Sequence, residues 1–251
     1  MVDPLAFSSD LLPTEHFDRR FSADNLAFWV PVIVEAGRIS RDTLVLDVGC
    51  GTGGFSRAVA DTAGARVTGL DVSQKFIAHA RRQSSGVEWV VGEAERLAFA
   101  AETFDRVLLS LVLHQLADPL AAVREAQRVL RRGGLLLVRT IAPEDVAERI
   151  PERYLPSMAA ADAARLPRIE QIERWLEEAR FDLVETRRVL RNKRLTLEEA
   201  ETDLLGEVRG RYAFISDEEL ADGLRRMRAD AAAAAVWVDP RPTYLVLGAR
   251  S

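Results

Sequence analysis

Hydrophobic residues along the chain alternate between short continuous runs and a wider, helical spacing. Five apolar runs have the length and pattern of buried strands: 43–49, 65–71, 87–91, 104–113 and 135–140. Between these runs, apolar residues recur every three or four positions, which is the period of an amphipathic helix. We therefore predict five strands that alternate with helices. This order is typical of a parallel sheet that helices cover on both faces.

Capping residues mark the ends of several predicted helices. Ser73 is placed to cap the helix after the second strand, with Val72 and Ile77 as a hydrophobic staple around it. Asp118-Pro119 is placed to open the helix after the fourth strand, because a proline at the first helical position loses no hydrogen bond. Gly133-Gly134 is expected to end that helix.

The regular alternation ends near residue 140. Residues 141–166 show no clean period, and a predicted helix over 168–178 then leads into a strand over 181–190. Two further helices each begin with a capping box: Thr196 with Glu199, and Ser216 with Glu219. A terminal strand is predicted over 242–250. The second part of the chain is therefore richer in helices than the first.

The strongest local signal is the sequence LDVGCGTGG, residues 46–54, which follows the first strand and opens a helix. Glycines let the backbone approach a ligand closely, and the N–H groups at a helix N-terminus favour an anionic ligand group. The next strand ends in Asp71, 22 residues after Gly49. A carboxylate there can accept hydrogen bonds from both hydroxyls of a ribose. The pattern therefore predicts an adenosine-containing ligand.

Two classes of adenosine ligand fit this turn. Gly49, Gly51 and Gly54 satisfy the G-x-G-x-x-G pattern, so the glycine spacing leaves NAD open as a ligand. Asp47 favours the other class, because its carboxylate would repel an anionic pyrophosphate and attract an ammonium or sulfonium group. A purely structural glycine turn is the third alternative.

Composition and charge narrow the range of functions. The chain has 251 residues, of which 48% are apolar and 29% charged, as expected for a globular protein with a sizeable core. The formal net charge of −5 argues against nucleic acid or an anionic membrane as a partner, since both favour basic patches. The single cysteine, Cys50, cannot form an intramolecular disulfide, which fits a reducing compartment. Because neither a spanning apolar stretch nor a secretory signal is evident, we expect a cytoplasmic protein without membrane insertion.

Five segments carry a more specific pattern: LDVGCGTG (46–53), VTGLDVS (67–73), VVGEAERLAF (90–99), FDRVLLSLVLHQLADP (104–119) and REAQRVLRRGGLLLV (124–138). In this order they resemble class I S-adenosylmethionine-dependent methyltransferases. The chain is most similar to the small-molecule group that includes the ubiquinone and menaquinone biosynthesis methyltransferases. Glu93 replaces the aspartate usual in the third segment, and Ala98 replaces the usual proline. The resemblance is close over 41–140 and loose elsewhere.

This resemblance implies an α/β fold with a Rossmann-like seven-stranded, mostly parallel sheet and helices on both faces. The last strand would be antiparallel, with a helical cap inserted before it. The resemblance also implies S-adenosyl-L-methionine as the cofactor. The glycine turn and Ser110 would face its methionine part, Asp71 its ribose, and Val72, Glu93 and Ala94 its adenine. With Asp47 included for its charge, the predicted cofactor-binding residues are Asp47, Gly49, Cys50, Gly51, Asp71, Val72, Glu93, Ala94 and Ser110.

We expect one methyltransferase domain over 1–251. Its predicted segments are an N-terminal arm and helix (1–40), a cofactor-binding core (41–140), a helix and sixth strand (141–190), a helical cap insert (191–241) and a terminal strand (242–251). The two capped helices of the insert are predicted to cover the substrate side. Such a cap favours a small-molecule acceptor in an enclosed pocket over a macromolecular target.

Methyl transfer is an in-line displacement, so it needs a base only if the nucleophile must lose a proton. His114 is the candidate catalytic base or substrate contact, because it follows the fourth strand, where ligands of open α/β sheets bind. His79 is expected on a solvated surface, and His16 in the N-terminal arm could close over the site. Phe17, Phe21, Phe28 and Trp29 would form either an aromatic lid or plain core. No residues have metal-ligand spacing, so we predict no metal.

Two other functions stay open at this point. The first is an NAD-dependent oxidoreductase, which the glycine spacing allows. The second is a non-catalytic protein that keeps the cofactor-binding fold. The residues leave the identity of the acceptor atom and the oligomeric state open.

Overall fold

The computed structural model describes residues 21–83, 86–210, 212–231 and 237–251. These residues divide into two compact units. The sheet unit contains the described residues up to Thr140, together with Ile169–Arg187 and Tyr244–Ser251. The helical unit contains the described residues of Ile141–Arg168 and Arg188–Thr243.

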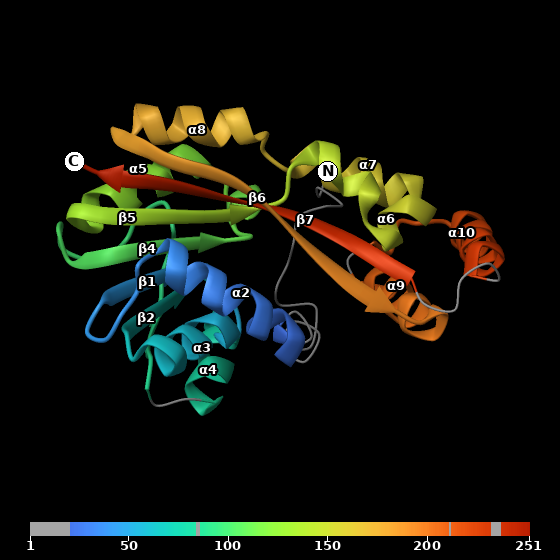
Figure 1. The fold of residues 1–251 in the computed structure, drawn as a ribbon, viewed down its shortest axis with the longest axis horizontal. Coiled ribbons are helices and arrows are strands. Elements are labelled where there is room, and N and C mark those ends of the chain that lie inside the picture. Colours follow the sequence, from blue (N-terminus) through green and yellow to red (C-terminus); the bar gives the residue numbers. More distant parts are fainter. Residues whose placement is uncertain (1–20, 84–85, 211, 232–236) are drawn as a thin grey trace. The chain divides into compact units, whose positions relative to one another are not determined.

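The sheet unit is built on a seven-stranded sheet with the strand order β3-β2-β1-β4-β5-β7-β6 (Figure 1). The strands are β1 (Leu44–Val48), β2 (Arg66–Asp71), β3 (Glu88–Val91), β4 (Phe104–Ser110), β5 (Leu130–Thr140), β6 (Phe181–Leu195) and β7 (Trp237–Arg250). The first five strands pair in parallel, and β7 runs antiparallel to β5. The predicted Rossmann-like sheet, mostly parallel with an antiparallel last strand, is therefore confirmed.

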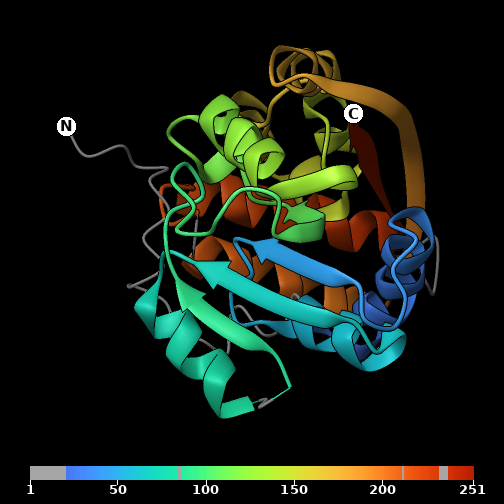
Figure 2. The ribbon, with the colours of Figure 1, turned by 90° about the vertical axis from the view of Figure 1, so that its left-hand side faces the viewer.

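Helices pack on both faces of this sheet (Figures 1 and 2). One face carries α2 (Ala23–Ala36), α3 (Gly54–Ala63) and α4 (Gln74–Gln83), and the other carries α5 (Pro119–Val129) and α8 (Ile169–Glu178). The strand order changes direction at β1 and β4. Because the crossover between parallel strands is right-handed, this reversal moves the later helices to the opposite face. The carboxyl ends of β1 and β4 consequently meet at the point where ligands bind in such sheets.

The first turn of α5 matches the prediction and its end does not. Asp118 caps the helix, since its carboxylate accepts a backbone N–H at 3.0 Å. The helix ends at Val129, before the predicted Gly133-Gly134. Leu130 is already extended, is fully buried and pairs with Phe104 of β4. The burial of Leu130 in the sheet therefore ends this helix before the glycines are reached.

The helix α4 corrects two details of the prediction. Ser73 accepts the N–H of Phe76 at 3.3 Å, so the predicted cap forms. The predicted hydrophobic staple does not form, because Ile77 is buried while Val72 is 69% exposed. His79 is also buried, whereas a solvated surface was expected. It lies three residues after Phe76 and therefore on the same buried side of the helix.

The helical unit includes helices in the segment that shows no clean period. Its elements are the 3₁₀ helix η3 (Pro143–Glu148), α6 (Ile150–Tyr154), α7 (Pro156–Arg165), α9 (Leu197–Gly210) and α10 (Asp217–Ala231). They enclose an apolar core of their own, with Leu155, Leu204 and Met227 fully buried. None of the described helices of either unit is long and apolar enough to cross a membrane.

The two predicted capping boxes differ in the structure. At α9 both bonds form: Thr196 N–H donates to the Glu199 carboxylate at 2.8 Å, and Glu199 N–H donates to Thr196 Oγ1 at 3.3 Å. At α10 only one bond of the box forms, from Glu219 N–H to Ser216 Oγ at 3.1 Å. The Glu219 carboxylate accepts the N–H of Ser157 instead, at 2.8 Å. That bond joins α7 to the start of α10.

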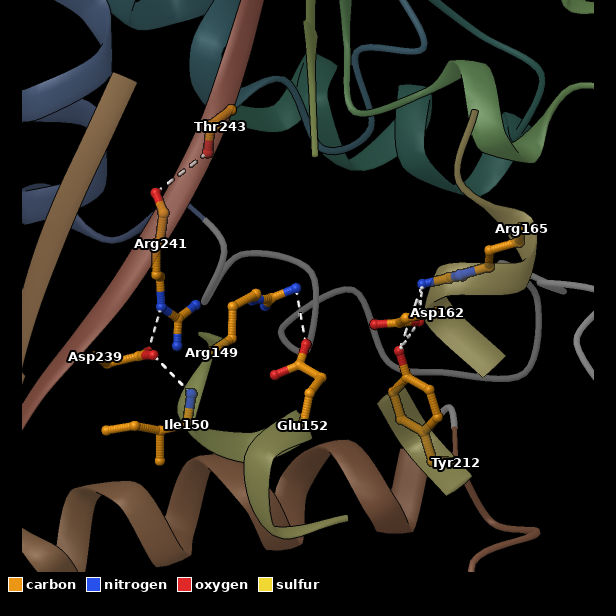
Figure 3. A network of polar contacts seen from close by, with 9 residues as sticks. All are labelled: Arg149, Ile150, Glu152, Asp162, Arg165, Tyr212, Asp239, Arg241 and Thr243. Atoms are coloured by element: carbon orange, nitrogen blue, oxygen red, sulfur yellow. Dashed lines mark hydrogen bonds and ion pairs between the residues drawn. The ribbon is translucent and has the colours of Figure 1, made fainter. Parts of the chain in front are cut away.

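A buried polar network runs through the helical unit (Figure 3). Three arginines pair with three buried carboxylates: Arg149 with Glu152 at 2.8 Å, Arg165 with Asp162 at 2.6 Å, and Arg241 with Asp239 at 2.6 Å. Tyr212 also donates to Asp162, at 2.5 Å. Because these charges balance within the network, we interpret it as an internal support of the helices and not as an attractor for a charged ligand.

Candidate cofactor site

The site is built on the turn between β1 and α3. Gly49, Gly51 and Gly53 have φ angles of +73°, +58° and +81°, which side chains other than glycine rarely adopt. A Cβ at Gly49 would lie 2.4 Å from Cγ2 of Val112, so glycine is also required there by space. The Gly49 N–H donates to the Leu70 carbonyl at 2.7 Å. This bond holds the turn against the carboxyl end of β2.

Asp71, the last residue of β2, is oriented by two backbone amides. Its Oδ2 accepts the N–H of Gly51 at 2.9 Å, and its Oδ1 accepts the N–H of Ser73 at 2.9 Å. Burial raises the pKa of Asp71, and these two bonds oppose that rise. Each carboxylate oxygen has a second lone pair, so the fixed group can accept two further hydrogen bonds from a ligand.

An apolar surface adjoins this carboxylate. Val72 is exposed directly after Asp71, and Val91 of β3 pairs in register with Asp71 and is also exposed. Glu93 and Ala94 follow β3 at the same edge of the sheet. Glu93 is exposed, 3.7 Å from an arginine of the same turn, and Ala94 is buried. The residues assigned to adenine by resemblance therefore gather at one edge of the sheet.

Asp47 lies deeper than the rest of the turn. Its carboxylate is 2% exposed and accepts the hydroxyl of Ser56 at 2.6 Å, a bond that ties β1 to α3. Burial raises the pKa of Asp47 to about 6, and the nearby Asp71 adds to the rise. The Ser56 bond and the charge of Arg139 oppose it. The effect of burial on the pKa is larger than these two opposing effects, so the pKa of Asp47 stays at about 6.

We expect Asp47 to make stability fall with rising pH. A carboxyl with a raised pKa stabilises the folded state fully below its ordinary pKa of 3.8, and this contribution is lost as the pH rises through about 6. Between about pH 4 and pH 7, the unfolding free energy of wild type minus that of Asp47→Asn should fall by about 2.5 kcal/mol. Urea denaturation of both proteins across this range measures the difference. A difference that is constant with pH would contradict the assignment.

The ends of β4 and β5 complete this edge. Ser110 is the last residue of β4 and pairs in register with Arg139 of β5, whose Nη1 donates to Ser110 Oγ at 3.3 Å. His114 lies just beyond β4, in the 3₁₀ helix η2 (Leu113–Gln115), and is half-buried. Val112 of the same segment packs on the turn at Gly49. The structure therefore brings Ser110 and the segment that carries His114 to the glycine turn.

Two aromatic residues of the N-terminal part, Phe21 and Trp29, have different surroundings. Phe21 lies against the turn, since a Cβ at Gly54 would be 2.3 Å from its Cγ, and its ring packs edge-on against Phe55 at 5.7 Å. Trp29 is buried core. The predicted contributions of His16 and Phe17 lie outside the described residues.

Two features of the turn fit a bound nucleoside-type cofactor. Among the described atoms, a Cβ at Gly51 would meet none closer than Phe21 Cζ at 3.9 Å. Thr52 is fully buried, and its hydroxyl has no hydrogen-bond partner within the described part of the chain. Buried hydroxyls are usually paired. With the carboxylate of Asp71 and the exposed Val72, these features fit an adenosyl group that carries polar substituents.

Sequence reasoning missed two residues of this region. Ser56, which holds Asp47, carries no sequence signal beyond its place in the first turn of a helix. Arg139 does carry one, because it is an arginine at the end of an otherwise apolar buried strand. Such a position is rare for a charge without a specific partner. Cys50 is buried, and burial raises the pKa of its thiol.

The strand order, the glycine-rich first crossover and the acid at the end of β2 define a class: a Rossmann-like α/β protein with a nucleoside-type site at the carboxyl edge of its sheet. Comparison with known families makes this class specific. Residues 46–138 match the family described as "Methyltransferase domain". A match to this family implies S-adenosylmethionine as the cofactor.

Individual relatives agree with this family. The chain is 38% identical over 130 residues to the malonyl-[acyl-carrier protein] O-methyltransferase of Enterobacter lignolyticus, covering 52% of this chain and 49% of that protein. It is 37% identical over 110 residues to the ubiquinone biosynthesis O-methyltransferase of Parvibaculum lavamentivorans, covering 42% and 43%. The matches thus span less than half the length of these curated relatives.

A solved structure supports the fold. The crystal structure of a SAM-dependent methyltransferase from Aquifex aeolicus superposes with a TM-score of 0.58 at 18% identity, covering 70% of this chain and 92% of that one. At this identity the likeness concerns the fold alone.

Proposed function

We propose that the protein transfers a methyl group from S-adenosylmethionine to a small-molecule acceptor. The observation that carries this proposal is the carboxylate of Asp71, which two backbone amides orient beside the exposed Val72. A ribose needs paired acceptors for its hydroxyls, and adenine needs an apolar surface next to them. The methyltransferase domain over 46–138 supports the choice of this cofactor.

When bound, the cofactor supplies a sulfonium methyl group, which a nucleophile takes by in-line displacement. In our proposal, Gly49, Cys50 and Gly51 contact its methionine part through their backbone. Asp47 acts through its charge, since its buried carboxylate attracts a cationic group above the turn. The protein's own contribution is thus to orient the reactants and exclude water.

Other residues have proposed roles at the same edge. Asp71 holds the ribose, Val72 packs on the adenine, and Glu93 and Ala94 line the adenine edge. Ser110 lies at the methionine end, beside Arg139.

His114 is proposed as the base or substrate contact. It follows the strand that ends at Ser110, and its segment packs on the turn through Val112. We propose further that residues 1–251 act as one methyltransferase domain.

Titration calorimetry tests the cofactor. We expect the wild-type protein to bind S-adenosylhomocysteine and to leave NADH unbound, because the charge of Asp47 disfavours a pyrophosphate. Tight binding of NADH alone would instead favour an oxidoreductase. The second stage uses methyl-labelled S-adenosylmethionine with a panel of small hydroxyl, amine, thiol and activated-carbon compounds. Cofactor binding without transfer to any class would favour a non-catalytic binding protein.

A further inference from the structure

The segment that follows β3, residues 92–100, carries two residues of the proposed adenine edge, Glu93 and Ala94. All of its residues are described by the structure, and they form neither a helix nor a strand. Its first residue is anchored to the sheet, because the N–H of Gly92 donates to the carbonyl of Asp71 at 3.0 Å. A loop of this kind has no hydrogen-bond ladder of its own. The place of its later residues therefore depends on contacts with other elements.

Two side chains of α5 bind this segment at Leu97. The N–H of Leu97 donates to Oε2 of Glu125 at 2.8 Å, and its carbonyl accepts a hydrogen bond from Nη2 of Arg128 at 2.9 Å. Arg128 Nη1 also donates to the carbonyl of Phe99, at 2.8 Å. Leu97 itself is buried. Both main-chain groups of this residue are thus fixed by one helix.

The two side chains of α5 also fix each other. Arg128 Nε donates to Oε1 of Glu125 and Arg128 Nη2 donates to Oε2, both at 2.8 Å. Glu125 and Arg128 lie three positions apart and therefore on the same side of the helix. The hydrogen bond with Arg128 lowers the pKa of Glu125, and the N–H of Leu97 adds to this effect. The carboxylate stays ionised, and the planar guanidinium keeps donors for the two carbonyls of the segment.

A further contact reaches the segment from the residue before the cap of α5. The N–H of Ala117 donates to Oε1 of Glu95 at 3.2 Å. The two adenine-edge residues thus lie between one anchor at Gly92 and two more at Glu95 and Leu97. A partly exposed ion pair contributes little to stability by itself. The larger consequence of the pair in α5 is therefore the position of the segment that it binds.

We propose that Glu125 and Arg128 are positioning residues that, by fixing the segment after β3, set the preference of the site for adenine over other purine bases. This inference rests on the proposed function, in which Glu93 lines the adenine edge. A carboxylate there can accept a hydrogen bond from the amino group of adenine. Hypoxanthine carries an oxygen at the same carbon, which a carboxylate repels. Such discrimination requires Glu93 to stay in one place, and the pair in α5 acts only through that placement.

Calorimetry with two ligands that differ only in the base tests this role. S-Adenosylhomocysteine carries adenine, and S-inosylhomocysteine carries hypoxanthine. We expect wild type to bind the adenine compound at least about 10-fold more tightly. Glu125→Gln keeps the size of the side chain but replaces one accepting oxygen with an NH₂ donor. This variant should bind S-adenosylhomocysteine about 5- to 10-fold more weakly and S-inosylhomocysteine within about twofold of wild type.

Arg128→Lys tests the other member of the pair. Lysine keeps the charge but has no planar fork, so it cannot hold Glu125 and two carbonyls at once. We expect the same loss of preference for adenine as in Glu125→Gln. Because the two side chains act as one unit, the variant that combines both substitutions should lose no more preference than either single variant.

A matched control is Arg131→Lys. Arg131 also combines a carboxylate with a main-chain carbonyl, since it donates to Asp105 at 3.0 Å and to the carbonyl of Glu102 at 3.4 Å. Both partners lie outside residues 92–100. We expect this variant to bind both compounds as wild type does. Urea denaturation of every variant shows whether it is folded, and a merely structural role would weaken both compounds together.

Three results would overturn the positioning role and leave the proposed function standing. They are equal weakening of both compounds in the folded variants, an unchanged preference for adenine in them, and equal binding of the two compounds by wild type. If Arg128→Lys does not fold, the more conservative Glu125→Gln decides. If wild type binds neither compound, the proposed function itself fails, and the positioning role fails with it.

Discussion

Replacing Asp71 with alanine should weaken the binding of S-adenosylhomocysteine by about 100-fold or more. Hydrogen bonds to a charged carboxylate contribute about 1.5–3 kcal/mol each, and we assign two of them to ribose hydroxyls. The substitution also removes the acceptor for the N–H groups of Gly51 and Ser73, so the turn loses its support. Calorimetric titration of the purified variant measures the loss.

A matched control separates ligand binding from loss of structure. Asp105 also accepts a backbone N–H, that of Leu44 at 2.8 Å, and it pairs with Arg131. It lies near the amino ends of β4 and β1, at the opposite edge of the sheet from the turn. Asp105→Ala should therefore lower stability and leave the affinity unchanged. Unaltered affinity in Asp71→Ala would refute the assigned site.

Gly49→Ala should destabilise the protein by about 2–5 kcal/mol. A left-handed backbone costs a residue with a Cβ about 1–2 kcal/mol, and overpacking adds about 1–3 kcal/mol. Both terms apply here, because φ is +73° and the added Cβ would lie 2.4 Å from Val112. Relief of the clash would move the turn away from the end of β2, so we also expect weaker S-adenosylhomocysteine binding. Urea denaturation and calorimetry measure the two effects.

Gly133→Ala is the control that measures the cost of the left-handed backbone without the cost of overpacking. Its φ is +75°, close to that of Gly49, but a Cβ there would meet nothing within 4 Å. Gly133→Ala should therefore destabilise by about 1–2 kcal/mol and leave ligand binding unchanged. Equal losses of stability in the two variants would show that packing on Val112 contributes little.

The predicted strands and helices follow the structure closely because they depend on local periodicity. The five apolar runs became β1 to β5, and the capped segments became α4, α5, α9 and α10. Two of the errors share a cause, since in each of them a distant residue overrides a local preference. Leu130 leaves its helix to pair with Phe104, and the carboxylate of Glu219 bonds Ser157 in place of its own cap.

The candidate site also has features that the sequence predicts and features that depend on tertiary contacts. The glycine turn and Asp71 were readable, because positive φ angles favour glycine and the acid ends a recognisable strand. The orientation of that acid was not readable, since it depends on a bond to Gly51, 20 residues away in the chain. The raised pKa of Asp47 could not be predicted from the sequence either. It is caused by burial, and burial depends on how the tertiary structure packs.

The sequence by itself determined the succession of strands along the chain, the position of the glycine turn and the acid at the end of the next strand, because each follows from residues that are neighbours along the chain. Only the tertiary structure decided that Arg139 meets Trp29, Phe55 and Ser110 at the edge of the sheet. These residues come from four separate elements, and periodicity within any one element carries no information about which side chains the packed sheet and helices bring into contact.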